Sequence, residues 1–238
     1  YYTQYYAPNN AVMAVSGDVD PQEVFKLAEK YFGDYEPREV NRLGITEPEQ
    51  TEERFIKIEK VTQVPLIGMM YKIPAGNHPD IVALNALNAI LVNNATSRVN
   101  SVLKNEKHLI MQAGSFSFEL RDPSYLFVYL IPMSVKSMDT VKEAFDAEIQ
   151  RLIDEGVTEE ELAAVKKAAL KSKVFSLKNK GSFASQLAIN TLRFNDPDLY
   201  KRSYQQLEAL TGEDIREAAR KYFVPQKRTV GYVVPKGK

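Results

Sequence analysis

The chain has 238 residues, of which 44% are hydrophobic and 26% are charged, and its 31 basic and 31 acidic side chains give a formal net charge of zero. This balance argues against a nucleic-acid partner, which requires many phosphate-neutralising cations, and against a polybasic membrane patch. The absence of cysteine excludes disulfides, thiolate metal sites and cysteine nucleophiles. There is also no run of about 18 apolar residues that would predict a transmembrane helix.

The first 35 residues predict a short strand followed by a helix. Residues 11–17 form an apolar run that ends in glycine, which is typical of a buried strand. Asp20 and Pro21 are suited to the N-cap and first position of a helix that ends near Gly33. Such a pair is too small to bury its own apolar side chains, so we interpret residues 1–35 as the C-terminal remnant of an upstream domain. Residues 36–52, with prolines, charges and no clear period, predict a linker.

Residues 53–238 predict a domain of their own. Strands are expected at 55–58, 65–71, 110–120, 125–132 and 229–234, with a hairpin turn at 121–124. Helices are expected at 79–105, 137–155, from a capping box at Thr158, at 183–192 after a break at Gly181, and from a cap at Thr211. This order predicts an α+β fold, in which helices are layered on an antiparallel-rich mixed sheet.

Side chains that could carry out metal or nucleophilic chemistry are few. The sequence has two histidines, His78 and His108, whereas a zinc site needs three or four ligands with at least two closely spaced. The sequence contains neither of the zinc motifs H-x-x-E-H and H-E-x-x-H. It also lacks a nucleophilic-serine elbow and a phosphate-binding loop. A structural role at the ends of helices is the simpler interpretation of both histidines. The residues alone therefore predict an α+β module without a catalytic signature.

Small side chains interrupt the strand expected at 110–120. The sequence there is Ala113-Gly114-Ser115, followed by Phe116. Glycine in a strand marks an edge, a bulge or the close approach of another backbone. An exposed edge could accept an extended peptide as an added strand. The structural alternative is a twist or bulge beside a core strand.

Several stretches, in order, resemble the pitrilysin/insulinase (M16) zinc metallopeptidases, and the resemblance spans nearly the whole chain. They are Tyr-Ala-Pro-Asn-Asn-Ala at 6–11, Val-Ser-Gly-Asp-Val-Asp-Pro at 15–21, Lys-Tyr-Phe-Gly at 30–33, Thr-Glu-Glu-Glu-Leu at 158–162, Thr-Gly-Glu-Asp-Ile at 211–215 and Lys-Tyr-Phe at 221–223. The resemblance implies the LuxS/MPP-like metallohydrolase fold, in paired α+β domains that enclose a chamber. It makes residues 1–35 the tail of a catalytic-type domain, and residues 53–238 a non-catalytic second domain.

The family's zinc ligands lie upstream of the Tyr-Ala-Pro-Asn-Asn stretch, so the resemblance implies no metal in this segment and zinc in the parent protein. A partner domain of this family often supplies an Arg and a Tyr after a Ser-Arg pair. Here Ser97-Arg98 aligns with that pair, and the two positions fall on Lys104 and Met111. Lysine lacks the planar fork of arginine, and methionine cannot donate a hydrogen bond to an oxyanion. This departure implies no catalytic residue here and resembles the second domain of the long, four-domain members, where small residues on the strand after this helix hold the substrate's end by strand addition. Those small residues map to Gly114 and Ser115, and the substrate-binding candidates are Gly114, Ser115, Phe116, Lys104 and Met111.

The expected function is that of a non-catalytic fragment of a zinc-dependent metalloendopeptidase. It would wall the chamber and bind extended peptide or unfolded polypeptide, while a domain in cis or in a partner chain carries H-x-x-E-H. The alternative is a scaffold or partner subunit of a peptidase-like complex with no substrate role. A third hypothesis is an unrelated enzyme with a site at His78 or His108. Because long bacterial members are often exported, the resemblance favours the periplasm over the cytoplasm.

Overall fold

The structure is a computed structural model that describes residues 1–40, 44 and 47–236. It divides into two compact units. The helical unit comprises Tyr1–Pro48 and Ala169–Arg202, and the sheet unit comprises Glu49–Ala168 and Ser203–Lys238. The expected linker at 36–52 includes residues 41–43 and 45–46, which lie outside the described residues.

The helical unit contains no strand among its described residues. Its helices are α1 (Tyr2–Tyr5), the 3-10 helix η1 (Pro8–Asn10), α2 (Pro21–Phe32), α6 (Lys180–Phe194) and parts of α5 (Glu159–Lys178) and α7 (Leu199–Ala209). The helix expected after Pro21 is confirmed, and the Asp20 side chain accepts a hydrogen bond from the Gln22 amide at 2.8 Å. The strand expected at 11–17 is wrong. Ala11 is extended, but a strand needs a neighbour with which to pair, and the described part of this unit offers none.

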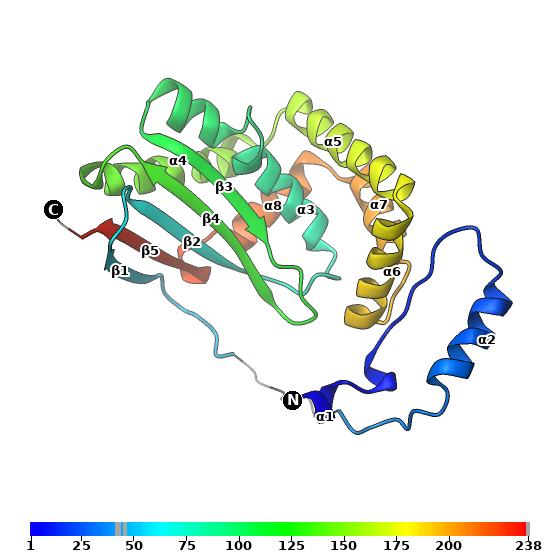
Figure 1. Ribbon diagram of the computed structural model, residues 1–238. Helices are drawn as coiled ribbons and strands as arrows, with labels where there is room; N and C mark the ends of the chain where they lie inside the picture. Colours follow the sequence, from blue (N-terminus) through cyan, green and yellow to red (C-terminus); the bar gives the residue numbers. More distant parts are fainter. Residues whose placement is uncertain (41–43, 45–46, 237–238) are drawn as a thin grey trace. The chain divides into compact units, whose positions relative to one another are not determined.

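The sheet unit is built on a five-stranded mixed sheet with the order β1-β5-β2-β4-β3 (Figure 1). The strands are β1 (Arg54–Lys60), β2 (Leu66–Ile73), β3 (Ile110–Ser117), β4 (Ser124–Pro132) and β5 (Arg228–Pro235). Only β1 and β5 pair in parallel, and the other three pairings are antiparallel. The expected α+β class with an antiparallel-rich sheet is confirmed. This order places β1 and β3 at the two edges.

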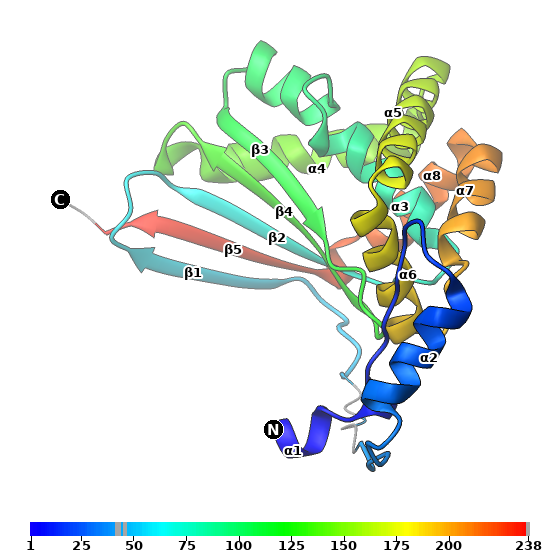
Figure 2. The same cartoon turned by 45° about the vertical axis from the view of Figure 1, so that its right-hand side comes forward.

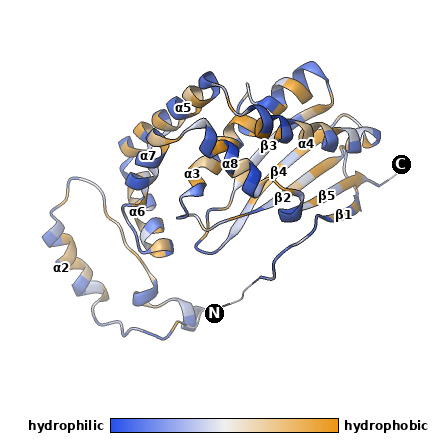
Figure 3. Ribbon diagram, turned by 180° about the vertical axis from the view of Figure 1, so that it is seen from behind, coloured by the Kyte–Doolittle hydropathy of each residue, from blue (hydrophilic) through white to orange (hydrophobic). Residues whose placement is uncertain are grey.

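Helices α3 (Asp80–Asn88), α4 (Met138–Glu155) and α8 (Gly212–Tyr222) lie on one face of this sheet. Figure 2 shows them on the same side of the strands, and Figure 3 shows them from behind, in front of the sheet. Side chains alternate along β4, so Leu126, Val128 and Leu130 are fully buried beneath the helices. Phe145 of α4 and Ile215 of α8 complete this core. Among the described residues of the sheet unit, no helix covers the opposite face.

The single helix expected at 79–105 is wrong, because the chain breaks in the middle. After α3 come a π-helix, η2 (Ala89–Asn93), and a second π-helix, η3 (Asn100–Glu106). Asn94 between them is extended, with φ −109° and ψ 153°. Its side chain donates to the Ala89 carbonyl at 3.0 Å, and the Ser97 hydroxyl donates to the Val92 carbonyl at 3.0 Å. Short polar side chains thus satisfy the carbonyls that a continuous helix would use.

The helices after residue 155 have the caps that the sequence predicts, but their number differs from the prediction. The capping box at Thr158, paired with Glu161, and the cap at Thr211 are confirmed, and the cap at Thr211 is also a capping box, paired with Asp214. The break expected at Gly181 is wrong by two residues, because Asn179 caps α6 by accepting from the Ser182 amide at 2.9 Å. Helix α7 was not anticipated, and short 3-10 helices occur at η4 (Val135–Ser137) and η5 (Pro225–Lys227). No described helix has the length and apolar character needed to cross a membrane.

Candidate substrate-binding edge

Four of the five candidate residues lie on β3, the edge strand. Gly114, Ser115 and Phe116 are consecutive, and Met111 lies at an irregularity of register between Ile110 and Gln112. The fifth candidate, Lys104, lies on η3 and is exposed. The irregularity shows that the bulge considered as an alternative is present, three residues before Gly114.

The hydrogen-bond pattern fixes which backbone groups of β3 point away from the sheet. The Phe118 amide donates to the Tyr125 carbonyl of the neighbouring chain segment at 2.9 Å. Because the backbone groups of successive residues in a strand point in alternate directions, those of Gly114 and Phe116 also point toward β4. The amides and carbonyls of Ala113, Ser115 and Ser117 therefore face the outer edge.

At Ser115 this outer edge is occupied by the chain itself. The Ser115 amide donates to Oδ1 of Asn93 at 2.9 Å, and Nδ2 of Asn93 donates to the Ser115 carbonyl at 3.0 Å. The Ser115 hydroxyl in turn donates to Oδ1 of Asn88 at 2.5 Å, and Asn88 is only 5% exposed. Sequence reasoning missed both asparagines. The Asn93-Asn94 pair at the end of an apolar helical stretch was the one available signal.

Gly114 makes room for an aromatic ring. A Cβ atom built on it would lie 2.5 Å from the hydroxyl oxygen of Tyr129 and 2.6 Å from two ring carbons. Gly68 of β2 is similar, since a Cβ there would lie 3.0 Å from the Phe127 ring. Tyr129 also accepts a hydrogen bond from Nε2 of Gln112 at 3.0 Å. The small residue in β3 is thus explained by cross-strand packing, without the approach of a second backbone.

An apolar patch lies on the sheet face that the helices leave uncovered. Phe116 is 47% exposed, and its ring centroid lies 5.3 Å from that of Phe118 and 5.1 Å from that of Phe127. Met70 of β2 is the register partner of Phe127. We call this set the aromatic patch: Met70, Phe116, Phe118, Phe127 and Tyr129. It adjoins the outer edge of β3, so a strand added there would have side chains beside it.

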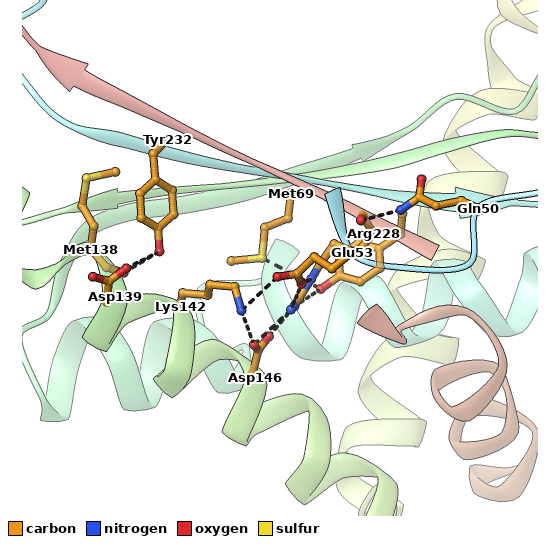
Figure 4. Close-up of polar contacts among 10 residues, drawn as sticks. Gln50, Glu53, Met69, Met138, Asp139, Lys142, Asp146, Arg228 and Tyr232 are labelled. Carbon is orange, nitrogen blue, oxygen red and sulfur yellow. Dashed lines mark hydrogen bonds and ion pairs between the residues drawn. The ribbon is translucent and has the colours of Figure 1, made fainter. Parts of the chain in front are cut away.

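Charged side chains gather on the opposite, helix-covered side (Figure 4). Arg228 at the start of β5 is 3% exposed and pairs with Asp146 of α4 and with Glu53. Lys142 lies 3.1 Å from Asp146 and 3.5 Å from Glu53. Burial by itself lowers the pKa of Arg228, but the interactions with Asp146 and Tyr71 together outweigh this effect, and the net pKa lies above the ordinary value. Arg228, Glu53, Asp146 and Lys142 are all paired with one another, so the cluster holds β5, α4 and the segment before β1 together.

A second ion pair anchors the loop between the two π-helices. Arg98 is 7% exposed, and its guanidinium donates two hydrogen bonds of 2.8 Å to the Glu161 carboxylate and one of 2.8 Å to the Gly156 carbonyl. Burial tends to raise the pKa of Glu161, but the bonds from Arg98 and the Thr158 amide lower it overall. The Ser97-Arg98 stretch, which marked an alignment in the sequence, is therefore structural in this chain.

The histidines have local roles. Nδ1 of His78 accepts from the Asp80 amide at 3.1 Å, at the start of α3. Nδ1 of His108 lies 3.2 Å from the Lys104 carbonyl, just after η3. Within residues 1–40, 44 and 47–236, no group of three or more His, Asp or Glu side chains is arranged to hold a metal ion. The residues described here do not form a zinc site.

Comparisons with known proteins agree with this architecture. A sequence model described as "Peptidase M16 inactive domain" matches residues 1–169. The chain is 30% identical over 245 aligned positions to "Zinc protease PqqE" of Helicobacter pylori, which covers 99% of this chain and 54% of that protein. It thus spans about half the length of this curated relative.

Solved structures show the same fold. A protease from Helicobacter pylori superposes with a TM-score of 0.86 and 25% identity, over 92% of this chain and 54% of that one. A peptidase M16 inactive domain from Pseudomonas fluorescens superposes with a TM-score of 0.78 and 17% identity, over 93% of this chain and 53% of that one. The periplasmic protease PqqL from Escherichia coli superposes with a TM-score of 0.72 and 17% identity, over 92% of this chain and 25% of that one. The chain belongs to the M16 peptidase family, as an inactive domain of that family of zinc proteases.

Proposed function

We propose that this chain is the non-catalytic part of a zinc-dependent metalloendopeptidase, where it walls the chamber and binds extended peptide along β3. The observation that carries the proposal is the edge position of β3, next to the aromatic patch. Outward-facing groups at Ala113 and Ser117 offer main-chain hydrogen bonds to an added strand. The aromatic patch offers an apolar surface for alternate side chains of that strand.

The proposal assigns zinc to another part of the parent protein. The described residues provide no cluster of metal ligands. The relative named a zinc protease is about twice as long as this chain, which leaves room for a domain that carries the metal. We place that domain in cis or in a partner chain. Residues 1–35 would be the tail of an upstream catalytic-type domain, 36–52 a linker and 53–238 the non-catalytic domain. We also propose a periplasmic location, because the related PqqL is a periplasmic protease.

The test of the edge uses proline at two sites. Ala113→Pro removes an outward N–H and leaves the β3–β4 hydrogen bonds intact, because the Ala113 amide and carbonyl face the outer edge although Leu130 of β4 is its register partner. The matched control is Glu59→Pro on β1, the other edge. The Lys236 amide bonds the Lys60 carbonyl toward β5, so alternation turns Glu59 outward as well. The probe is a fluorescein-labelled peptide of alternating threonine and valine, about ten residues long.

We expect Ala113→Pro to weaken peptide binding about tenfold, since it removes one hydrogen bond and puts a ring against the incoming strand. Glu59→Pro should bind like the wild type. Equal affinity of all three proteins would contradict binding along β3. Gly114→Val is a poorer variant for this purpose, because its side chain would displace Tyr129 and disturb the aromatic patch.

One observation favours the alternative of a scaffold that never meets substrate. Asn93 already occupies the Ser115 edge, so β3 does not present an unbroken row of free groups. The sequence of the whole gene separates the two functions. H-x-x-E-H upstream supports the substrate-binding role, whereas its absence throughout supports a scaffold or a heterodimer partner.

A further inference from the structure

The side chain of Asn93 imitates a neighbouring strand. Its amide exchanges two hydrogen bonds with the backbone of one residue, accepting from the Ser115 N–H at 2.9 Å and donating to the Ser115 carbonyl at 3.0 Å. A residue of an antiparallel partner strand makes the same pair of bonds. The Asn93 amide therefore stands where a peptide group of an added strand would stand.

This contact falls in the middle of the outward-facing row. Ala113 and Ser117 lie two residues on either side of Ser115, so a strand that pairs with both must also pass Ser115. Asn93 blocks that register as long as its side chain stays in place. A peptide bound without displacing it would reach only one side of Ser115.

The surroundings allow Asn93 to leave without loss of β3. Asn93 is exposed and is the last residue of η2, next to the extended Asn94. The Ser115 hydroxyl stays bonded to the buried Asn88 amide, and the β3–β4 ladder does not involve Asn93. Rotation of this exposed side chain would therefore free the Ser115 amide and carbonyl while β3 keeps its position.

We infer that Asn93 is a latch on the outer edge of β3, which an extended peptide must displace in order to pair across Ser115. This inference rests on the proposed function, and it identifies the residue that controls access to that site. The latch also blunts the edge against unwanted pairing with other chains, since a free edge strand recruits any extended segment.

The experiment compares the wild-type chain with Asn93→Ala and Asn93→Leu. The matched control is Asn85→Ala, because Asn85 is exposed on α3 and its side chain bonds the Glu119 carboxylate, at 2.8 Å, instead of β3 backbone groups. Binding of the alternating threonine–valine peptide is measured by fluorescence anisotropy. Hydrogen exchange of the Ser115 amide is followed by NMR in the same proteins, with and without peptide, and circular dichroism checks that each variant is folded.

We expect both Asn93 variants to bind about tenfold more tightly, because the peptide no longer competes with two hydrogen bonds of the chain. The Ser115 amide should be protected in the wild type, exposed in the variants, and protected again when peptide binds. Asn85→Ala should match the wild type in both measurements.

Two other results would overturn the latch, and they differ from one another. If the wild type and both Asn93 variants bind peptide equally, strand addition stands and Asn93 does not gate it. If none of these proteins binds the peptide, the proposed function fails, and the latch has nothing to control.

Discussion

At the scale of single residues, the pair of Arg98 and Glu161 shows how this chain ties irregular segments together. Arg98 comes from the loop between two π-helices, and Glu161 from the first turn of α5, where it also completes the capping box with Thr158. The Glu161 carboxylate thus accepts hydrogen bonds from two guanidinium nitrogens of Arg98 and from the Thr158 amide. Its charge stabilises the fold only while it stays ionised.

This arrangement predicts a pH dependence of stability. The pKa of Glu161 is lowered in the folded chain from an ordinary value of 4.5, so its stabilising effect is complete above that pH and is lost as the pH falls through the folded pKa. Wild-type protein should therefore lose more unfolding free energy between about pH 5 and pH 3 than Glu161→Gln does. Urea unfolding at a series of pH values measures this difference.

Arg98→Met provides the second arm of that measurement. It removes the cation that lowers the pKa of Glu161, so its stability should also change less on acidification than that of the wild type. Parallel curves for the wild type and both variants would show that the ion pair does not contribute to acid sensitivity.

At the scale of elements, the face of β3 and β4 depends on matching small and large residues across strands. Tyr129 lies over Gly114, and Phe127 lies beside Gly68, so the rings fit where Cβ atoms are missing. The same rings form part of the aromatic patch. The packing of the sheet and the proposed binding surface therefore use the same side chains.

Gly114→Ala should destabilise the fold by about 1–3 kcal/mol, because the new methyl group overlaps the Tyr129 ring. In a Tyr129→Ala background the same change should cost much less, since the ring that it meets is absent. A double-mutant cycle of urea unfolding energies measures the coupling. Additive effects of the two substitutions would contradict this account of Gly114.

Most individual helices and strands could be predicted from local sequence patterns, whereas the contacts between them could not. The strand expected at 125–132 and the caps at Asp20, Thr158 and Thr211 rest on local signals, and the structure confirms them. The apolar run at 11–17 carried the same kind of signal, but its pairing depends on a partner strand that is absent from the described unit. The helix at 79–105 was overextended because apolar spacing continued while asparagines ended the helical hydrogen bonds.

The candidate site was predicted in part. The small residue Gly114 directed attention to β3, but the reason for the glycine lies in Tyr129, fifteen positions away in the sequence. The edge position of β3 follows from the order of five strands, which single-strand patterns do not encode. The contact of Asn93 with Ser115 also joins residues far apart in sequence, so it became visible only in the folded chain.

At the scale of the whole molecule, the chain belongs to a family of zinc proteases, yet its described part has no cluster of metal ligands. It spans about half of its curated relative. These two facts are consistent with a division of labour in the parent, in which one domain cuts the peptide and another holds it. The separate fragment should then bind an extended peptide and leave it whole.

The most direct test follows the labelled threonine–valine peptide while it is incubated with the purified chain and zinc salt. Anisotropy reports binding, and mass spectrometry of the same samples reports whether the peptide is intact. The account predicts that the anisotropy rises while the mass of the peptide stays unchanged. Cleavage that a chelator abolishes would contradict it, because this chain would then contain a metal-dependent active site of its own.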